Sequence, residues 1–405
     1  QTCALPILLH FFMIFLLFLC MYKIKVDDYV LDISFLSKKY VPTFFIIFLW
    51  YLASLFWTPN IILGAKYVFF IFCGSVIALG VIFYSSNIKR LDNIFNILSV
   101  FIFIEIGIAL LESFTSFRMP ISSYSNISSF FGKDPSSFLL SENTFINSKI
   151  RPPTGFRWNT NDLAICMVIA FPFFLCNKKS LIKIFGIISI TLIIAMTASR
   201  AGFLSLLLVY FLYLLLIKKR ALVLAAVWII SASMFWGMMQ FKSSENPRIN
   251  ELANSIDALV LFLRGDIDLG GSIEWRRELV ENGLSAFAGT YGIGLGAGGS
   301  AANQELIGPV AGRFTSMHNF WIELLVEGGV FVAFIMLFWI IGMLNNLFKL
   351  SRSSLNHKLK YYSESLFLSL TAFFPAAVAA SSTIYFFPMW IMFGFSISVI
   401  YLSEN

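Results

Sequence analysis

The sequence predicts an all-α membrane protein with many spanning helices. Hydrophobic residues make up 58% of the 405 residues and charged residues 13%, whereas soluble domains carry about 25% charged residues. The mean hydropathy is +0.82, and apolar runs long enough to cross a bilayer recur along the chain. The net charge of +7 is the excess that basic cytoplasmic loops produce, so no nucleic-acid partner is expected.

Apolar runs of spanning length define the predicted elements in order. They cover about eleven segments: 5–22, 41–57, 61–84, 93–112, 162–176, 181–198, 201–217, 221–240, 319–345, 361–381 and 384–402. We interpret residues 1–405 as a single transmembrane domain. The chain enters its first apolar run at once and lacks an initial methionine, so we expect a missing start and twelve helices in the full-length protein.

Basic residues between these runs fall in alternate loops, which predicts the topology. Lys38 and Lys39, Lys89 and Arg90, and 218–220 are examples, and the positive-inside rule places such loops in the cytoplasm. Two long polar segments, 113–161 and 241–318, then lie outside. In the second, IEWRRELVENGLSAF has apolar residues at helical spacing, which predicts a short helix at the membrane surface.

Several arginines lie on the outer side, against the charge rule. They are Arg151, Arg157, Arg200, Arg276, Arg277 and Arg313. Arg200 stands in the short turn TASRAGFL between two apolar runs, which places it near the membrane boundary. Ionisable groups at this depth tend to be functional. The alternative is an arginine that only snorkels to the interface.

His318 is the histidine that this topology places outside, at the start of a spanning run. His10 lies in the first apolar run and His357 in a basic cytoplasmic loop. A neutral histidine can accept a proton from a hydroxyl group, and its ordinary pKa predicts an acidic limb of the rate near pH 6.5. Position alone leaves an incidental interfacial histidine equally open. Glu323 and Glu327, one turn apart, could orient His318 or an arginine, supply the base, or simply be interfacial.

The glycine string GIGLGAGGS precedes His318. Gly294, Gly296 and Gly299 match G-x-G-x-x-G, but no βαβ unit surrounds them, so a nucleotide fold is set aside. We expect these glycines to allow a close turn beside His318 and an approach to a sugar chain. Asp266 and Asp268 form D-x-D on the outer side, where nucleotide-sugars are absent, so this site is set aside too.

Four blocks together carry a resemblance to a known family. RPPTGFRWNTNDLA, TASRAGFLSL, SIEWRRELVENGL with GIGLGAGG, and MHNFWIELLVEGG occur in this order. This arrangement resembles the O-antigen ligase and O-antigen polymerase family, which includes teichuronic-acid-type polymerases. The blocks cover about 150–335, and the topology extends the likeness to the rest of the chain.

The resemblance implies a metal-independent glycosyltransferase of the C superfamily that needs no cofactor. Its catalytic residues would be His318, Arg200 and Arg276, with Arg277 as an alternative register for the loop arginine. The wider substrate-binding set would be Arg151, Arg157, Asn161, Asp162, Arg277 and Asn319. A tryptophan that many ligases carry after the loop arginine is absent here, which favours a polymerase over a ligase.

The expected function is transfer of glycan repeat units from a polyprenyl-pyrophosphate donor to an acceptor hydroxyl. The reaction would take place at the outer face of a bacterial cytoplasmic membrane, with membrane lipid as the surrounding partner. The acceptor would be the next repeat unit or, for a ligase, a lipid A core. A polysaccharide flippase is the alternative of another class, but it would show internal repeats and charges at the midplane, which this sequence does not.

Overall fold

Helices make up the described part of the chain in the computed structural model. The structure describes residues 39–125, 127–128, 152–197, 199–218, 272–310, 315–379, 384 and 386–404. The α-helices are α2 (Pro42–Ala53), α3 (Ile61–Tyr84), α4 (Ile88–Phe114), α7 (Thr160–Leu175), α8 (Ser180–Thr197), α9 (Arg200–Leu212), α12 (Ser272–Ala288), α13 (Gly299–Ile307), α14 (Phe320–Ser353), α15 (His357–Ala376) and α16 (Phe387–Glu404). A 3₁₀ turn, η2 (Ser54–Phe56), extends α2, and a π-helical turn, η4 (Tyr213–Ile217), extends α9. The predicted all-α fold is confirmed.

The helices have the length and composition of membrane spans. Among the described residues, six are long and apolar enough to cross a bilayer: α3, α4, α8, α9 with η4, α14 and α16. Two shorter apolar helices cover Pro42–Phe56 and Thr160–Leu175. The predicted spans 5–22 and 221–240 lie outside the described residues. The chain is therefore a multi-pass membrane protein.

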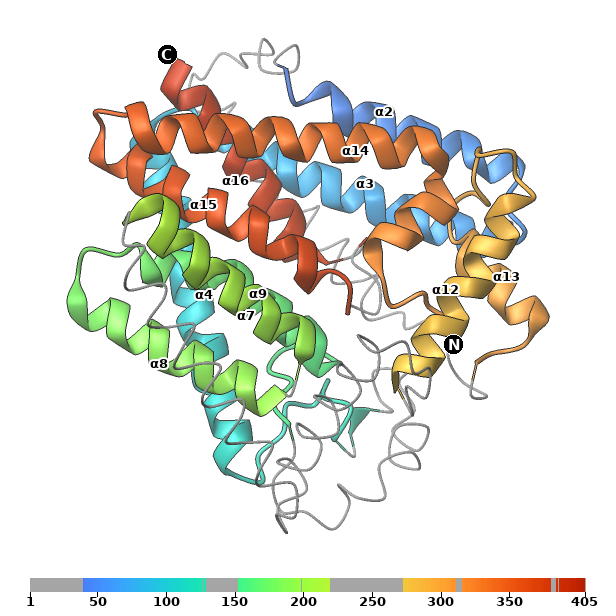
Figure 1. Ribbon diagram of the computed structural model, residues 1–405, viewed down its shortest axis with the longest axis horizontal. Helices are drawn as coiled ribbons and strands as arrows, with labels where there is room; N and C mark the ends of the chain where they lie inside the picture. The colour runs from blue at the N-terminus through green and yellow to red at the C-terminus, as the bar shows by residue number, and fades with distance from the viewer. Residues whose placement is uncertain are drawn as a thin grey trace, which may run out of the picture.

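The helices form two neighbouring groups (Figure 1). In one, α14 packs on α2 and α16, and α3 packs on α2 and α16. In the other, α7 packs on α8, α9 and α15. The polar helix α12 packs on α13 and on α14, at the end of the bundle where α14 begins (Figure 1). The IEWRRELVENGLSAF segment therefore forms the predicted helix.

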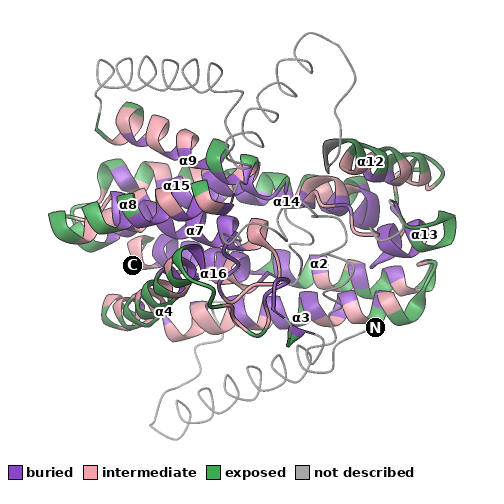
Figure 2. Ribbon diagram, turned by 90° about the horizontal axis from the view of Figure 1, so that it is seen from below, coloured by how far each residue is buried: buried purple, intermediate pink, exposed green. Residues whose placement is uncertain are grey.

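Burial separates the centre of the bundle from its lipid-facing surface. In Figure 2, buried residues gather along α7 and α16, while α4 and α12 carry exposed faces. Leu163 to Phe171 on α7 are all buried. Phe101 on α4 and Ile188 on α8 are large apolar side chains that stay exposed. Contiguous exposed apolar surface is rare on soluble monomers and is what a bilayer covers.

The helix α14 is broken at Gly329, although the sequence predicts one continuous span over 319–345. Gly329 has φ 75° and ψ −179°, which is outside helical geometry. The glycine string docks at this break. Leu295 N–H donates to the carbonyl of Val326 (2.8 Å), and Val330 N–H donates to that of Gly292 (2.9 Å). These bonds satisfy backbone groups that the break releases, as membrane depth requires.

The glycine string makes its close approach to the protein's own backbone, and its expected approach to a sugar chain stays a prediction. A Cβ on Gly294 would lie 2.5 Å from the carbonyl oxygen of Glu327, so the glycines approach the protein's own backbone. The residues just after η2 bind the other side of the glycine string. Trp57 Nε1–H donates to the Gly294 carbonyl (3.0 Å), and Thr58 Oγ1–H donates to the Ala297 carbonyl (2.8 Å). The string therefore fixes the first half of α14, which follows His318 directly.

Gly329→Ala should destabilise the protein. A Cβ there would lie 2.2 Å from the Ile293 carbonyl oxygen, and the positive φ alone costs an L-residue about 1–2 kcal/mol. Thermal unfolding followed by tryptophan fluorescence should show a clearly lower midpoint. Gly107→Ala on α4 is the matched control, because a Cβ there meets nothing within 4 Å. Equal midpoints for the two variants would show that the break at Gly329 is not needed.

Candidate active site

Three segments far apart in the sequence bring together the predicted catalytic side chains. Arg200 is the first residue of α9, Arg276 lies in the first half of α12, and His318 stands two residues before α14. Helix starts are set by local caps: Ser199 Oγ accepts from Gly202 N–H (3.3 Å) and Asn319 Oδ1 from Trp321 N–H (3.2 Å). The sequence thus places the arginine and the histidine at defined helix ends.

Electrostatic coupling links these three residues. Burial, and next the charge of Arg200, lower the pKa of Arg276. Burial, and next the charge of Arg276, lower the pKa of His318 to about 4. Since charges act strongly only at short range in a protein, Arg276 lies near both Arg200 and His318. Two neighbouring guanidinium groups repel each other, and an anion bound by both relieves that repulsion.

The backbone at His318 is strained. Its φ is 49°, in the left-handed region that non-glycine residues seldom adopt. Such a conformation persists only when its surroundings impose it, and it is concentrated at functional sites. Here Met317 is buried on one side and Asn319 caps α14 on the other. The strained residue thus lies where the segment packed against α12 leads into α14.

Packing of α12 distinguishes Arg276 from Arg277. Leu279 is buried, and a Cβ on Gly283 would lie 2.2 Å from Met317 Cε, so this face of α12 lies against the segment before His318. Arg277 is exposed and forms an ion pair with Glu281 one turn later (2.6 Å). The two arginine registers that the sequence leaves open therefore differ in the structure, and Arg276 is the one beside His318.

The other predicted substrate-binding residues have different surroundings. Asn319 uses its side-chain oxygen to cap α14, and Asn161 N–H donates to the Asn159 cap of α7 (2.9 Å). Asp162 lies partly buried in the first turn of α7. Arg157 is partly buried, and its guanidinium faces Glu105 (3.8 Å). Arg151 and Arg313 lie outside the described residues.

The two glutamates after His318 are both buried but have different contacts. Glu327 Oε1 accepts a hydrogen bond from Ser300 Oγ (2.6 Å), and its Oε2 accepts one from Gly298 N–H (3.2 Å). Its carboxylate therefore ties the glycine string and the start of α13 to α14. Glu323 is 1% exposed and lies on the same half-helix.

Two buried carboxylates on α4, Glu105 and Glu112, were not singled out from the sequence. Both hold the backbone of the segment that precedes α7. The signal that could have found them is the presence of acidic residues in an apolar run, because ionisable groups at membrane depth rarely lack a function.

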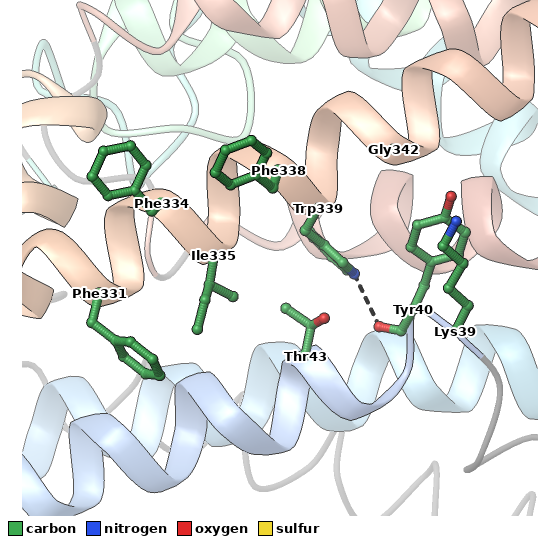
Figure 3. Close-up of a pocket in the computed structure, with 9 residues that line it drawn as sticks. All are labelled: Lys39, Tyr40, Thr43, Phe331, Phe334, Ile335, Phe338, Trp339 and Gly342. Carbon is green, nitrogen blue, oxygen red and sulfur yellow. Dashed lines mark hydrogen bonds between the residues drawn. The ribbon is translucent and has the colours of Figure 1, made fainter.

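An apolar groove lies between α2 and α14 (Figure 3). Its volume is about 570 Å³, and aromatic residues of α14 such as Phe334 and Phe338 line it. Trp339 Nε1–H donates to the Tyr40 carbonyl across the groove (2.9 Å), and Lys39 lies at the end near Tyr40. His318 and the outer arginines are not among its lining residues. Its surface suits hydrocarbon rather than a charged donor group.

Within the described ranges, no group of three or more His, Cys, Asp or Glu side chains could hold a metal ion. The candidate catalytic side chains are one imidazole, of His318, and two guanidinium groups, of Arg200 and Arg276. Metal independence remains a prediction.

The segment that carries these residues is similar to known proteins. The family model described as O-antigen ligase matches residues 185–338, a range that contains Arg200, Arg276 and His318. The chain is also 25% identical over 370 residues to the teichuronic acid biosynthesis protein TuaE of Bacillus subtilis strain 168, covering 87% of this chain and 70% of that protein. The resemblance predicted from the four sequence blocks is confirmed: this membrane protein is similar to the O-antigen ligase family over residues 185–338 and to a teichuronic acid biosynthesis protein over most of its length.

Proposed function

We propose that this protein is a glycosyltransferase that moves glycan repeat units from a polyprenyl-pyrophosphate donor to an acceptor hydroxyl. The observation that carries the proposal is the proximity of Arg276 on α12 to Arg200, the first residue of α9, and to His318, just before α14. A pair of guanidinium groups suits a pyrophosphate, which each can bind through two hydrogen bonds. A neutral imidazole beside them suits a hydroxyl that must lose its proton.

The reaction follows from these roles. His318 accepts the proton of the acceptor hydroxyl, and the oxygen attacks the anomeric carbon of the donor sugar. The bond from that carbon to the pyrophosphate oxygen breaks, and the polyprenyl pyrophosphate leaves with the electron pair. Arg200 and Arg276 stabilise the negative charge that develops on this leaving group. The proton stays on His318 until solvent removes it.

The acceptor and the side of the membrane belong to the same proposal. We place the site at the outer face of a bacterial cytoplasmic membrane, because the basic loops alternate and put Lys218 on the opposite side. The preferred acceptor is the next repeat unit, so that the product is a cell-surface polymer. The alternative acceptor is a lipid A core, which would make the protein a ligase. The matching family model is described as O-antigen ligase, which supports retaining this alternative.

A gel ladder tests the proposed activity. Purified protein in lipid nanodiscs is incubated with lipid-linked repeat units, and the products are separated by size. A regular ladder that is absent with His318→Asn supports polymerisation, and a single larger product that needs a lipid A core supports ligation. Transport of the same donor across vesicles without any covalent product would support a flippase instead.

The pH dependence of the rate should have an acidic limb well below the ordinary histidine range. Burial and the Arg276 charge favour neutral imidazole and lower the His318 pKa to about 4, so the limb near pH 6.5 expected from the sequence shifts. For the free enzyme, kcat/KM should stay level as the pH falls from 7 to 5 and decline near pH 4. Residual activity of Arg276→Ala should decline at a higher pH. A limb near pH 6.5 in both proteins would contradict this environment.

A further inference from the structure

The outer end of α4 carries two buried carboxylates whose role the proposed reaction does not explain. Glu105 is 5% exposed and Glu112 is fully buried. They are seven residues apart, so they lie on the same face of the helix two turns from each other. Burying a carboxylate is costly unless hydrogen bonds or opposite charges compensate it. The contacts of the two side chains show what they stabilise.

Glu112 joins the two ends of the first outer loop. Its Oε1 accepts a hydrogen bond from Met119 N–H (2.9 Å), which follows α4. Its Oε2 accepts hydrogen bonds from Thr154 N–H and Gly155 N–H (both 2.7 Å), which precede α7. One carboxylate thus holds three backbone groups from segments about 35 residues apart in the sequence, counted from Met119 to Thr154.

Glu105 continues this contact toward Arg157. Its Oε1 accepts from Phe156 N–H (3.1 Å), and its Oε2 faces the Arg157 guanidinium (3.8 Å). Gly155 has φ 56°, and a Cβ there would lie 2.6 Å from Glu105 Oε1. Glycine is therefore required for the close approach. The PTGFR part of the first sequence block has a physical explanation in these bonds.

The Arg157 side chain has several contacts that fix its position, but solvent can still reach it. Its Nη2 also donates to Cys166 Sγ (3.5 Å), and its guanidinium lies over the ring of Phe386 (5.7 Å). The side chain remains 26% exposed. A guanidinium fixed by a carboxylate, a thiol and an aromatic ring loses little side-chain entropy when it binds a further anion.

Arg157 and Arg200 stand near the starts of two adjacent helices, α7 and α9. A Cβ on Gly202, near the start of α9, would lie 3.0 Å from the Ala164 Cβ, near the start of α7. The two helices therefore begin side by side, and Arg157 stands three residues before α7 while Arg200 opens α9. Both arginines are thus presented at the same end of this helix pair.

We propose that Glu105 and Glu112 are positioning residues that fix Arg157 as a third guanidinium for the donor pyrophosphate. Glu112 sets the backbone of the loop, and Glu105 sets the direction of the Arg157 side chain. The inference rests on the proposed function. It extends the donor site from the junction of α9, α12 and α14 to the start of α7, outside the range that the family model matches.

A double-mutant cycle tests this arrangement. Glu105→Gln keeps an oxygen for Phe156 N–H but removes the charge that faces Arg157. We expect Glu105→Gln and Arg157→Ala each to raise the donor KM about tenfold with little change in kcat, and the double variant to show no further rise, as coupled neighbours do. Glu105→Asp, which keeps the charge, should restore part of the affinity. A purely structural role would make the two effects multiply.

Binding of a polyprenyl pyrophosphate without sugar gives a readout independent of turnover. Its Kd should follow the same cycle when measured in nanodiscs on folded protein of equal thermal midpoint. If Glu105→Gln does not fold, the Kd of Arg157→Ala is compared with that of the wild type: a Kd about tenfold weaker supports a donor contact by Arg157, and an unchanged Kd contradicts it. If the wild type binds the lipid but the effects of the Glu105 and Arg157 substitutions multiply, the positioning role is wrong and the proposed function still stands. Failure of the wild type both to bind the lipid and to transfer sugar overturns the proposed function instead.

Discussion

His318→Asn should abolish nearly all transfer while leaving the fold intact. General-base catalysis is typically worth about 10²–10⁴-fold, and an asparagine amide cannot accept the proton of the acceptor hydroxyl. Asparagine tolerates the left-handed backbone that His318 adopts with φ 49°. The loss should therefore appear in kcat, with unchanged binding of the polyprenyl pyrophosphate and an unchanged thermal midpoint. Initial rates with lipid-linked repeat units measure it.

His318→Gly separates strain from chemistry. Glycine removes the cost of a positive φ, about 1–2 kcal/mol for an L-residue, although its flexible unfolded chain offsets about 0.5–1 kcal/mol of that gain. The variant should be inactive but no less stable than the wild type. Glu323→Gln is the counterpart variant, because Glu323 is the alternative base on the same half-helix. Full turnover in His318→Asn with none in Glu323→Gln would assign the base to Glu323.

Much of the fold could be predicted because lipid imposes a strong constraint on sequence. Apolar runs such as 61–84 and 181–198 coincide closely with α3 and α8, since a spanning segment must satisfy its own backbone. The break in α14 was not predicted, because Gly329 lies in an apolar run that hydropathy alone treats as continuous. Its cause is a distant contact with the glycine string.

Candidate site residues could be proposed from the sequence where a single residue departs from a local rule. Arg200 contradicts the charge rule by itself, and His318 is marked by its place before an apolar run. The choice between Arg276 and Arg277 depended on which face of α12 packs against Met317, which only the structure shows. The partners of Glu105 and Glu112 could not be predicted from the sequence, because they lie about 40 to 50 residues later, in Thr154 to Arg157.

Arg276→Ala should cause the second large loss of activity. Removing one member of a buried, hydrogen-bonded charge pair costs about 2–5 kcal/mol, which corresponds to roughly 30-fold or more in donor affinity and rate. Arg276 is partly buried and Arg200 exposed, so solvent screens Arg200 more and Arg200→Ala should fall at the lower end. Lysine should rescue neither fully, because it lacks the planar fork that binds two phosphate oxygens.

Arg277→Ala decides whether this effect belongs to one position or to the charge of the loop. Arg277 is next in sequence, but it is exposed and paired with Glu281, and such surface pairs contribute at most about 1 kcal/mol. Its replacement should leave turnover near that of the wild type. Polyprenyl pyrophosphate should raise the thermal midpoint in the wild type and in Arg277→Ala, and much less in Arg276→Ala. Equal losses in Arg276→Ala and Arg277→Ala would show instead that the net charge of α12, and not a placed guanidinium, attracts the donor.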